Sequence, residues 1–575
     1  MPLTELKRRI RRWIDADPDP RTRAAGEALL AEGDVDRLRS HFGDRLSFGT
    51  AGLRAALGPG PGRMNQAMVR WATAGFAAHV AASIPDAAKR GLVVGFDGRH
   101  GSRPFAEEAA RVLASAGLRV MLYDRVAPTP QVAHAVRWLG AAGGVVVTAS
   151  HNPPQDNGYK VFWADGAQIV PPHDVAISAA IDALGGPWAV DPKPRADLEA
   201  AGVIAPVPAE AEAVYLDAIQ KLRVWERPGG LKVVYTAMHG VARRLITATL
   251  ERAGHTVIPV AAQADPDPDF PTVAFPNPEE PGALDLALAE AKAHAADLLV
   301  ANDPDGDRLA VAVPDGEGGF RPLSGNQVGV LLADELLRHG AQSDDRLVAT
   351  TIVSTGMLRR VAEAHGAAYA ETLTGFKWIA AEALKHDGAG GRFVMGFEEA
   401  LGYSIGPVVR DKDGISAALC FCDLAARCKA EGISVLDRLT ALYRAHGLFS
   451  TRQHSIKLPG AAGKTRIAAM MGRLRGAPPR TLDGVAVVRV RDLHTGYAVE
   501  ANGSTAPIDL PRSNVLAFDL ADGGRVLARP SGTEPKLKLY FEVRSPLDGP
   551  PAEAEAIAQA RLDRLQADLL GRLEA

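Results

Sequence analysis

A chain of 575 residues is too long for a single hydrophobic core, so the sequence predicts three or four domains. Apolar residues make up 47% and charged residues 23% of the chain, as in an ordinary soluble globular protein. The formal net charge of −3 gives no electrostatic reason to expect a nucleic-acid or membrane surface. No stretch approaches the roughly 18 continuous apolar residues that a membrane span needs.

The N-terminal stretch MPLTELKRRIRRWIDADPDP sets Leu, Ile and Trp at helical spacing among basic residues. No apolar segment follows it, so the pattern predicts an amphipathic surface helix and not a signal peptide. The next motif, SFGTAGLRAALG at residues 47–58, carries Arg54. We expect this arginine to reach the functional site as an anion contact.

From about residue 90, short apolar runs that end in polar residues alternate with helical stretches, as in GLVVGFDGR, RPFAEEAARVLASAG and GGVVVTASHN. This alternation is typical of βαβ units, in which helices cover both faces of a mostly parallel sheet. The pattern restarts at residues 231 and 346. We therefore expect three α/β domains, at residues 1–205, 206–321 and 322–447. Each carries a polar cluster just after a strand, where open α/β sheets bind their ligands.

The first cluster, TASHNPPQDNGYK, interrupts a buried strand and presents Ser150 on a loop stiffened by Pro153 and Pro154. A hydroxyl held in this way suits a residue that receives and returns a group at fixed geometry; the alternative is a solvent loop with an incidental serine. A Ser-His hydrolase is disfavoured, because no G-x-S-x-G elbow surrounds the serine. In extended backbone the Ser150 and His151 side chains would also diverge. Lys160 follows ten residues after the serine.

The second cluster, VANDPDGDR, places Asp303, Asp305 and Asp307 along a turn after a buried strand. Converging carboxylates repel one another unless a cation lies between them, and hard oxygen ligands select Mg²⁺ or a similar ion. An EF-hand starts with the same D-x-D-x-D pattern, but Arg308 and Pro314 stand where that loop requires glycine and glutamate. The acidic runs DADPDP and ADPDPDF are interpreted as ordinary loops.

The third cluster, GFEEALGY, sets Glu398 and Glu399 at a strand end beside glycines and an aromatic residue. These carboxylates are either solvated charges or acceptors for sugar hydroxyls. ETLTGFKW adds Lys377, which we expect on the neighbouring strand end.

A helical, apolar segment, SAALCFCDLAARCKA, holds all three cysteines of the chain: Cys420, Cys422 and Cys428. Without a fourth ligand and turn residues between them, buried free thiols are favoured over a metal site. Few cysteines and no signal sequence predict a cytoplasmic location.

After about residue 448 the pattern changes to antiparallel strands, an acidic-glycine turn at ADGG and a final amphipathic helix. We expect a smaller α+β domain at residues 448–575. Its cluster ARPSGTEPK presents a guanidinium, hydroxyls and backbone N–H groups together, as a phosphate dianion requires. The alternative is a tight turn with an exposed arginine. The residues concerned are Arg529, Ser531, Gly532 and Thr533.

Together, TASHNPPQDNGYK, DPDGDR, GFEEALGY and RPSGTEPK resemble the four active-site loops of the α-D-phosphohexomutase superfamily, over about residues 40 to 545. FGTAGLR, ETLTGFKW and DKDGISAA make the chain most similar to the branch that contains phosphoglucomutase-2-like enzymes and phosphopentomutases. The resemblance implies an α/β fold of four domains around a central cleft. Three related α/β domains would have mixed, mostly parallel sheets, and the C-terminal domain would be α+β.

The resemblance also implies roles for individual residues. Ser150 would carry the phosphoryl group, with His151 beside it and Lys160 as general acid or base. Arg54 and Arg308 would support the group in transfer. One Mg²⁺ per chain would be held by a phosphoserine oxygen of Ser150, Asp303, Asp305 and Asp307. The sugar phosphate would be bound by Lys377, Glu398, Glu399, Arg529, Ser531, Gly532 and Thr533.

The implied reaction moves a phosphoryl group between positions 1 and 6 of a hexose phosphate, with glucose phosphate as the expected substrate. A sugar 1,6-bisphosphate would be both intermediate and activator. Ala400 stands where many relatives place a serine, so a phosphopentomutase acting on ribose or deoxyribose 1-phosphate and a phosphomannomutase stay open. A non-catalytic sugar-phosphate sensor is disfavoured, because the nucleophile and the carboxylates are all present. Sugar phosphates are the expected partners, without nucleic acid or membrane, in a monomer or homodimer.

Overall fold

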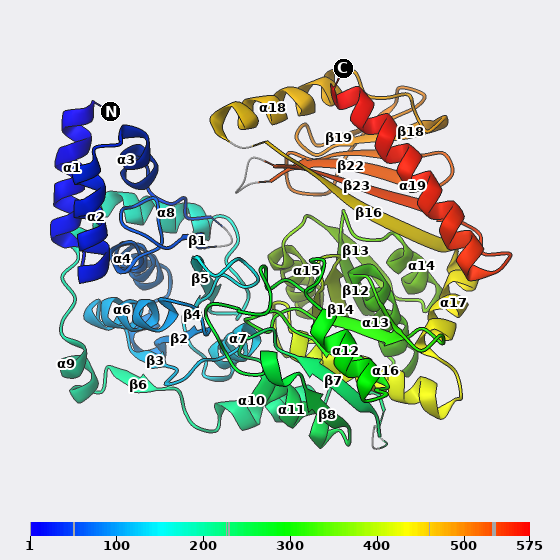
Figure 1. The fold of residues 1–575 in the computed structure, drawn as a ribbon, viewed down its shortest axis with the longest axis horizontal. Helices are drawn as coiled ribbons and strands as arrows, with labels where there is room; N and C mark the ends of the chain where they lie inside the picture. The colour runs from blue at the N-terminus through cyan, green and yellow to red at the C-terminus, as the bar shows by residue number, and fades with distance from the viewer. Residues whose placement is uncertain are drawn as a thin grey trace. The chain divides into compact units, whose positions relative to one another are not determined.

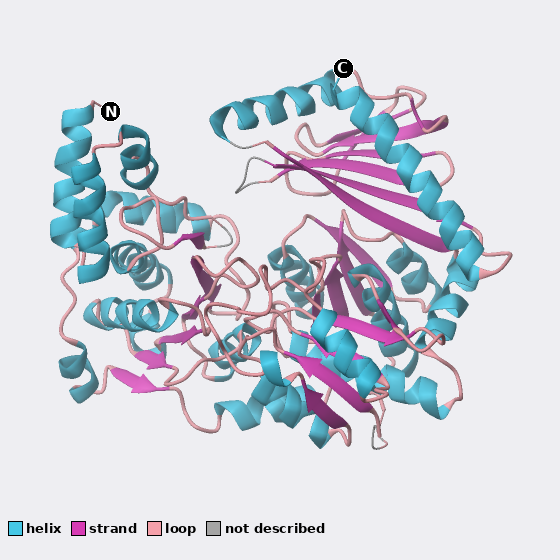
Figure 2. Ribbon diagram, viewed as in Figure 1, coloured by secondary structure: helices cyan, strands magenta, loops and turns pink. Residues whose placement is uncertain are grey.

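The computed structural model describes residues 2–49, 52–225, 227, 230–458, 460–531 and 536–574. The chain divides into two compact units of helices and strands (Figures 1 and 2). Met1–Val328 and Phe376–Gly432 form unit 1, whereas Gly329–Gly375 and Ile433–Ala575 form unit 2. None of the helices in the described part of the chain combines the length and apolar character that crossing a membrane requires. The boundaries of the four predicted domains stay a prediction.

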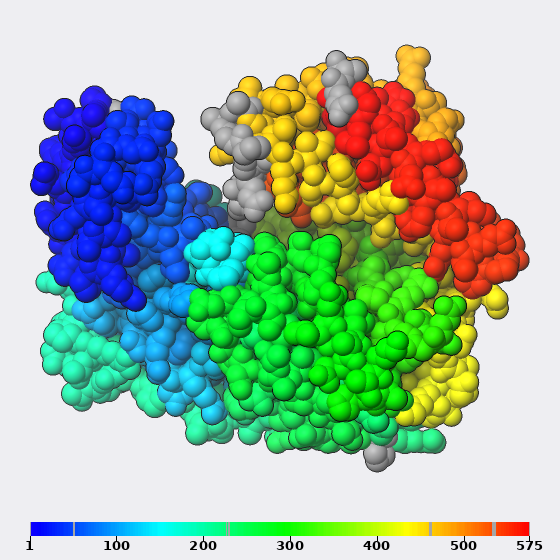
Figure 3. Space-filling model, viewed as in Figure 1, coloured from blue at the N-terminus to red at the C-terminus, as the bar shows by residue number. Residues whose placement is uncertain are grey.

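Unit 1 begins with three helices, α1 (Leu3–Ala16), α2 (Pro20–Glu32) and α3 (Val35–Phe42). Helix α1 confirms the predicted amphipathic helix, since it buries Leu6, Ile10, Trp13 and Ile14 while its basic residues face outward. The helix forms part of the molecular surface (Figure 3, dark blue). Its Trp13 ring meets Trp71 edge-to-face with the ring centroids 6.2 Å apart, so the N-terminal helices share a core with the domain that follows.

The first sheet has six strands in the order β1-β5-β4-β2-β3-β6. Their bounds are β1 (Leu53–Ala56), β2 (Leu92–Phe96), β3 (Val120–Leu122), β4 (Gly143–Val147), β5 (Asp156–Trp163) and β6 (Ile204–Pro206). Strands β4, β2, β3 and β6 run parallel, and β5 and β1 add antiparallel pairs at one edge. Strands β2 and β4 are buried along their whole length, as parallel strands between helical layers are.

The helices of this domain cover both faces of the sheet, with α4 and α6 on one side and α7 on the other (Figure 1). They are α4 (Gln66–Ser83), α5 (Ala87–Arg90), α6 (Ser102–Ser115), α7 (Thr129–Trp138), α8 (His173–Leu184), η1 (Pro187–Ala189) and α9 (Arg195–Ala200). Polar loops follow β2 and β4, and because these neighbouring strands are parallel, both loops lie at the carboxyl-terminal ends of the strands.

The second sheet repeats this plan with five strands in the order β11-β10-β9-β7-β8. Its strands are β7 (Lys232–Thr236), β8 (Thr256–Pro259), β9 (Leu298–Ala301), β10 (Ala310–Pro314) and β11 (Phe320–Pro322). The helices around it are α10 (Ala211–Gln220), α11 (Arg243–Arg252), η2 (Ala261–Gln263) and α12 (Asp285–Ala293). Strands β8, β7 and β9 are parallel, whereas β10 and β11 form antiparallel pairs. The acidic DPDGDR loop connects β9 to β10.

Unit 1 is completed by α15 (Phe376–Gly388), the hairpin of β14 (Arg392–Glu398) and β15 (Gly402–Ile405), and α16 (Gly414–Ala430). Helix α16 packs against α11 and holds the three cysteines, which are buried and form no disulfide in the described part of the chain, as predicted. Lys377 lies in the first turn of α15, so its predicted place on a strand end is wrong. Strand β13 already ends before TGF, and the apolar residues that follow it form the buried face of a helix.

Unit 2 contains the parallel pair of β12 (Arg346–Thr351) and β13 (Ala368–Thr372), with α14 (Met357–Ala364) and α17 (Val435–His446) packed together. Helix α13 (Gly325–His339) begins in unit 1 and ends in unit 2. The C-terminal strands are β16 (Leu448–Lys457), β17 (Thr481–Leu482), β18 (Val485–Asp492), β19 (Tyr497–Glu500), β20 (Thr505–Pro507), β21 (Leu516–Leu520), β22 (Arg525–Pro530) and β23 (Lys536–Ser545).

The C-terminal sheet is antiparallel, and the ADGG turn connects β21 to β22 as predicted. Helix α18 (Gly460–Gly476) precedes its central strands, and α19 (Pro551–Glu574) packs across β16 and β23. The predicted α+β class of this part of the chain is therefore confirmed.

Candidate active site

Ser150 lies three residues beyond the end of β4, in a left-handed backbone conformation with φ of 52°. This conformation costs an L-residue about 1–2 kcal/mol, so the surrounding contacts must hold it. The Ser150 N–H donates to Thr148 Oγ1 at 2.8 Å, and the Ser150 Oγ donates to Asp303 Oδ2 at 2.7 Å. The serine hydroxyl from the first sheet and the carboxylate from the second are thus in direct contact.

His151 also contacts this serine, because its Nδ1 lies 3.2 Å from Ser150 Oγ. The expectation that the two side chains diverge is wrong, since it assumed extended backbone and Ser150 is left-handed. Burial lowers the pKa of His151 well below its usual value, and the charges of Arg308 and Arg54 lower it further. The ring beside the serine is therefore neutral near pH 7.

The three aspartates meet at the end of β9, as predicted. All three are fully buried, and one carboxylate oxygen from each lies within 4.8 Å of the others. Burial raises the pKa of Asp303 well above its usual value, and the charges of Asp305 and Asp307 raise it further. Gly306 has φ of 71°, and a Cβ there would lie 2.9 Å from Ala242 Cβ, so the turn between the carboxylates requires glycine.

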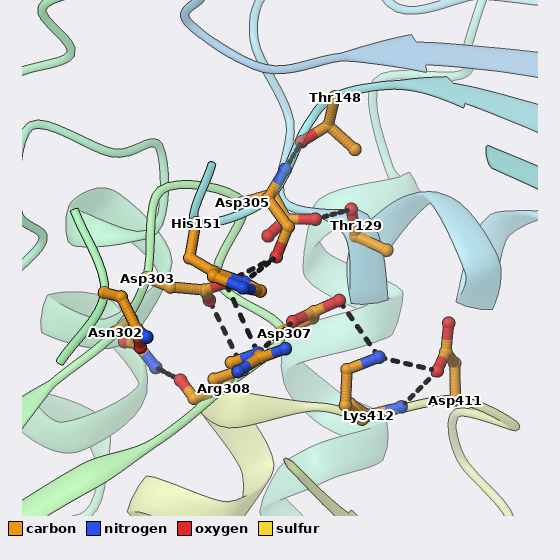
Figure 4. A network of polar contacts seen from close by, with 12 residues as sticks. Thr129, Thr148, His151, Asn302, Asp303, Asp305, Asp307, Arg308, Asp411 and Lys412 are labelled. Carbon is orange, nitrogen blue, oxygen red and sulfur yellow. Dashed lines mark hydrogen bonds and ion pairs between the residues drawn. The ribbon is translucent and has the colours of Figure 1, made fainter. Parts of the chain in front are cut away.

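Two lysines neutralise this cluster. Lys160, on β5, donates from Nζ to Asp305 Oδ2 at 2.7 Å and to Asp307 Oδ2 at 2.8 Å. Lys412 Nζ lies 3.2 Å from Asp307 Oδ2 (Figure 4). Burial acts to lower the pKa of each lysine, but the adjacent carboxylates outweigh it and the net shift is upward. Both lysines are therefore charged near neutral pH.

The remaining carboxylate oxygens fit a metal ion. Asp305 Oδ1 and Asp307 Oδ1 are buried and have no hydrogen-bond partner in the described part of the chain. An unsatisfied buried oxygen of a carboxylate is costly, and a cation beside it removes the cost. The donor set is entirely oxygen, which suits a hard divalent cation and not a soft one.

Arg308 closes the cluster on another side. Its Nε lies 3.9 Å from Asp303 Oδ2 and 4.0 Å from Asp307 Oδ1, and its Nη1 lies 3.8 Å from Glu279. Burial acts to lower the pKa of Arg308, but these carboxylates outweigh it and raise the pKa. The backbone of Arg308 also pairs with Gly402 of the β14–β15 hairpin, which brings the third predicted cluster to the acidic loop.

Glu398 is the last residue of β14 and is half-buried. Its charge contributes to the raised pKa of both Lys412 and Arg308, so it lies near both of them. Arg54 extends from β1, next to the strand that carries Lys160, and its Nη1 donates to Asn152 Oδ1 at 3.2 Å. The structure therefore brings Ser150, Lys160, Arg54, Arg308, Glu398 and the three aspartates close together, whereas the predicted sugar contacts of Lys377 and Glu399 stay a prediction.

The predicted phosphate-binding residues belong to unit 2. Arg529 lies on β22, and the Ser531 N–H donates to the Lys536 carbonyl at 2.7 Å in the connection to β23. Gly532 and Thr533 lie outside the described residues. The meeting of this cluster with Ser150 around a central cleft stays a prediction.

Sequence reasoning missed two further contacts of the site. Thr129, at the start of α7, donates from Oγ1 to Asp305 Oδ2 at 2.7 Å and from its N–H to the Asp305 carbonyl at 2.9 Å (Figure 4). Lys412 is oriented by Asp411, whose Oδ2 accepts from Gln168 at 2.6 Å. The DKDGISAA motif could have identified Lys412. Thr129 has no such motif, since a threonine at the start of a helix is common.

Family models match four successive parts of the chain. They are described as phosphoglucomutase/phosphomannomutase alpha/beta/alpha domain I (residues 45–185), domain II (213–317), domain III (324–445) and C-terminal domain (482–565). The chain belongs to the phosphoglucomutase/phosphomannomutase family. The α-D-phosphohexomutase resemblance and the four-domain architecture are thereby confirmed.

Curated relatives of this phosphoglucomutase/phosphomannomutase family member span nearly its full length. A probable phosphoribomutase of Schizosaccharomyces pombe is 38% identical, over 94% of this chain and 94% of that protein. A human phosphopentomutase is 36% identical, over 94% and 92%. A phosphoglucomutase of Staphylococcus epidermidis is 37% identical, over 87% and 90%. The family member described here is a mutase, an isomerase of the intramolecular phosphotransferase type.

Proposed function

We propose that the chain is a phosphopentomutase, which moves a phosphoryl group reversibly between positions 1 and 5 of ribose or deoxyribose phosphate. The buried contact between Ser150 Oγ and Asp303, beside Lys160, supports phosphoryl transfer through the serine. The pentose is supported by the relatives named phosphoribomutase and phosphopentomutase, which align with more than nine-tenths of the chain. The sequence led us to expect glucose first, and the pentose alternative now has the better support.

In this scheme phosphorylated Ser150 donates its phosphoryl group to the free sugar hydroxyl, and the sugar becomes a bisphosphate. The bisphosphate turns round and returns its other phosphoryl group to the serine. Such transfers depend mostly on positioning and on neutralising charge. Lys160 and Arg308 supply positive charge at the carboxylate cluster that Ser150 Oγ contacts. We assign the proton transfer to Lys160, which is charged near neutral pH and accepts the hydroxyl proton only after it has given up its own.

We assign the divalent site to Mg²⁺, held by Asp303, Asp305 and Asp307. The two unpartnered oxygens of Asp305 and Asp307 support this assignment. When bound, the ion would neutralise charge on the phosphoryl oxygens. Lys160 and Lys412 hold the Oδ2 atoms of Asp305 and Asp307 in place, and the Oδ1 atoms would be the ones to contact the ion.

We assign sugar contacts to Glu398, Glu399 and Lys377, and phosphate contacts to Arg529, Ser531, Gly532 and Thr533. The cytoplasmic location, the monomeric or homodimeric state and the bisphosphate activator stay predictions from the sequence. The second candidate is a phosphoglucomutase, which the Staphylococcus epidermidis relative favours. A phosphomannomutase is a further alternative within the same reaction type.

Kinetics on several sugars test the proposal. Initial rates would be measured side by side with ribose, deoxyribose, glucose and mannose 1-phosphates under saturating Mg²⁺ and sugar bisphosphate. We expect kcat/KM for ribose or deoxyribose 1-phosphate to exceed that for glucose 1-phosphate by about tenfold or more. A higher kcat/KM for glucose or mannose 1-phosphate would assign the chain to the corresponding hexose mutase.

Replacement of Ser150 by alanine tests the reaction itself. We expect Ser150→Ala to abolish turnover, because the proposed carrier of the phosphoryl group is removed, while sugar-phosphate binding persists in calorimetry. Turnover at the wild-type rate would remove the phosphoserine from the scheme.

A further inference from the structure

A buried arginine lies beneath the loop that carries Ser150. Arg99 follows β2, and its side chain is 1% exposed. Its Nη2 donates to the carbonyls of Ser150 and Asn152, each at 2.5 Å, and its Nη1 donates to the carbonyls of Pro153 and Asp156 at 2.8 and 3.4 Å. One guanidinium therefore binds four carbonyl oxygens of the same loop.

The guanidinium is fixed on its other sides as well. Its Nε lies 3.4 Å from Asp97 Oδ2, and Asp97 Oδ1 accepts hydrogen bonds from the Arg99 N–H at 3.0 Å and from Ser102 Oγ. The Phe270 ring covers it, with the guanidinium carbon 4.9 Å from the ring centroid. Arg99 thus has one position, which β2 and the start of α6 determine.

These contacts explain how Ser150 keeps its left-handed conformation. Thr148 Oγ1 holds the N–H of Ser150, and Arg99 holds its carbonyl, so the peptide planes on both sides of the serine are fixed. Converging carbonyl dipoles repel one another, and a planar cation between them removes the repulsion. Because the backbone is fixed on both sides, the direction of the Cα–Cβ bond is fixed, and the hydrogen bond to Asp303 then selects the rotamer that points the Oγ toward this carboxylate.

We propose that Arg99 is a positioning residue for phosphoryl transfer, which aims the Ser150 Oγ by holding the backbone carbonyls of its loop. None of the hydrogen bonds described for Arg99 reaches the carboxylate cluster or the Ser150 side chain. Its charge interacts with Asp305 and Asp303, and a lysine at this position would keep that charge but not the four carbonyl contacts. This inference rests on the proposed role of Ser150 as phosphoryl carrier.

Arg99→Lys is the decisive variant, since lysine keeps the charge but cannot bind four carbonyls with a planar fork. Arg346→Lys is the matched control. Arg346 is also a buried arginine, and it donates to the carbonyls of Leu337 and His365 in unit 2. Each dephosphorylated protein would be mixed with ribose 1,5-bisphosphate or, separately, glucose 1,6-bisphosphate, and the phosphorylation of Ser150 would be followed by intact-mass spectrometry in a rapid-quench experiment. Binding of ribose 1-phosphate would be measured by calorimetry.

We expect Arg99→Lys to slow phosphorylation of Ser150 by about 100-fold, because a misplaced nucleophile loses the in-line geometry of attack. Its affinity for ribose 1-phosphate should stay within about threefold of the wild type, whereas a merely structural role would lower both together. Arg346→Lys should lower the melting temperature and leave the phosphorylation rate unchanged. Asp97→Asn, which keeps the guanidinium but removes its carboxylate partner, should give the same separation of rate and affinity with a smaller loss of rate.

Two results would overturn the inference about Arg99 alone: phosphorylation of Arg99→Lys at the wild-type rate, or an equal loss of rate and affinity in this variant. If Arg99→Lys fails to fold, Asp97→Asn decides by the same two measurements. If wild-type Ser150 accepts no phosphoryl group from either bisphosphate, the proposed function fails and the role of Arg99 fails with it.

Discussion

Asp305 receives hydrogen bonds from parts of the chain that are far apart in sequence. Its Oδ2 accepts from Lys160 and from Thr129, and its carbonyl accepts the Thr129 N–H. Only Oδ1 is left without a partner in the described structure. The orientation of this carboxylate is therefore set by groups of the protein itself, which is the arrangement expected of a preorganised ligand.

Replacement of Asp305 by asparagine tests the metal assignment. Asp305→Asn keeps the shape of the side chain but removes one negative charge, so we expect the Mg²⁺ concentration for half-maximal activity to rise by about 10- to 100-fold. The measurement is a Mg²⁺ titration of the initial rate. Asp315→Asn, in an exposed turn of the same unit, is the matched control. An unchanged Mg²⁺ response in Asp305→Asn would contradict the ligand assignment.

Thr129→Val removes the hydroxyl that holds Asp305 and keeps the backbone contact. We expect kcat to fall by about tenfold and the free energy of unfolding to fall by about 1 kcal/mol, since one buried charge-assisted hydrogen bond is lost. Steady-state kinetics and urea unfolding would measure the two effects. Thr22→Val is a suitable control, because Thr22 is also at a helix start but contacts Asp17 and the Asp19 carbonyl and none of the three clustered aspartates. Wild-type kcat in Thr129→Val would show that the hydroxyl does not orient the carboxylate.

Among single residues, the sequence predicted those that belong to a short, recognisable motif. D-x-D-x-D after an apolar run identifies all three aspartates, whereas Thr129 lies 176 residues before its partner and has no distinguishing neighbour. Arg99 was missed for the same reason, since its role depends on a loop about fifty residues later. The contact between Ser150 and His151 was excluded on the assumption of extended backbone, and a left-handed serine cannot be inferred from TASHNP.

The position of the site is determined mainly by where the strands end, and less by any single residue. Ser150 follows β4, the aspartates follow β9, Glu398 ends β14, and Lys160 is carried by β5. Alternation of apolar strands and helices was sufficient to predict this arrangement, because parallel strands release their loops at one edge. The position of Lys377 could not be predicted, since GFKW is equally compatible with a strand end and with the first turn of a helix.

Packing between α4 and α8 gives a prediction at this scale. A Cβ on Gly75 would lie 2.4 Å from Ile181 Cγ1 and 2.8 Å from the Ile181 backbone nitrogen, so the two helices would have to separate. We expect Gly75→Ala to lower the free energy of unfolding by about 1–3 kcal/mol. Gly472→Ala, in a helix where nothing lies within 4 Å of the new Cβ, should instead raise it by about 0.5 kcal/mol. Urea unfolding of both variants checks this, and equal effects would be inconsistent with the packing described.

For the whole molecule, two buried histidines predict how stability depends on pH. Burial lowers the pKa of His255 to about 4, with a further contribution from Arg223, and it lowers the pKa of His134 to about 4, with a contribution from Arg137. In the unfolded chain both would titrate near 6.5, the ordinary pKa of a histidine side chain. The unfolded state therefore takes up protons first as the pH falls, and stability present above pH 6.5 is lost progressively toward pH 4.

Each histidine should cost about 2 kcal/mol of stability at pH 5 relative to pH 7. We expect His255→Leu to reduce this loss, so that the variant gains stability relative to the wild type as the pH falls from 7 to 5. Urea unfolding at several pH values would measure it, with His294→Gln, an exposed histidine paired with Glu290, as the control. A parallel pH dependence in His255→Leu and the wild type would contradict the neutral, buried state of His255.

The number and type of the domains were predictable, because the repeating α/β pattern and the change after residue 448 are properties of long segments. The preferred sugar was not predictable, since the sequence motifs that identify the family occur in relatives named for pentose and for hexose phosphates alike. Ala400 alone does not indicate whether a pentose or a hexose phosphate is the preferred substrate.

The first matched domain begins at residue 45, beyond α3. Yet Gly60 approaches that helix so closely that a Cβ would lie 2.3 Å from the His41 carbonyl, and Trp71 stacks its edge on Trp13. A chain shortened to begin at residue 45 would therefore expose the Trp71 ring and the glycine-rich turn to water as an apolar surface. We expect such a fragment to aggregate in solution, even though it would keep all the active-site residues.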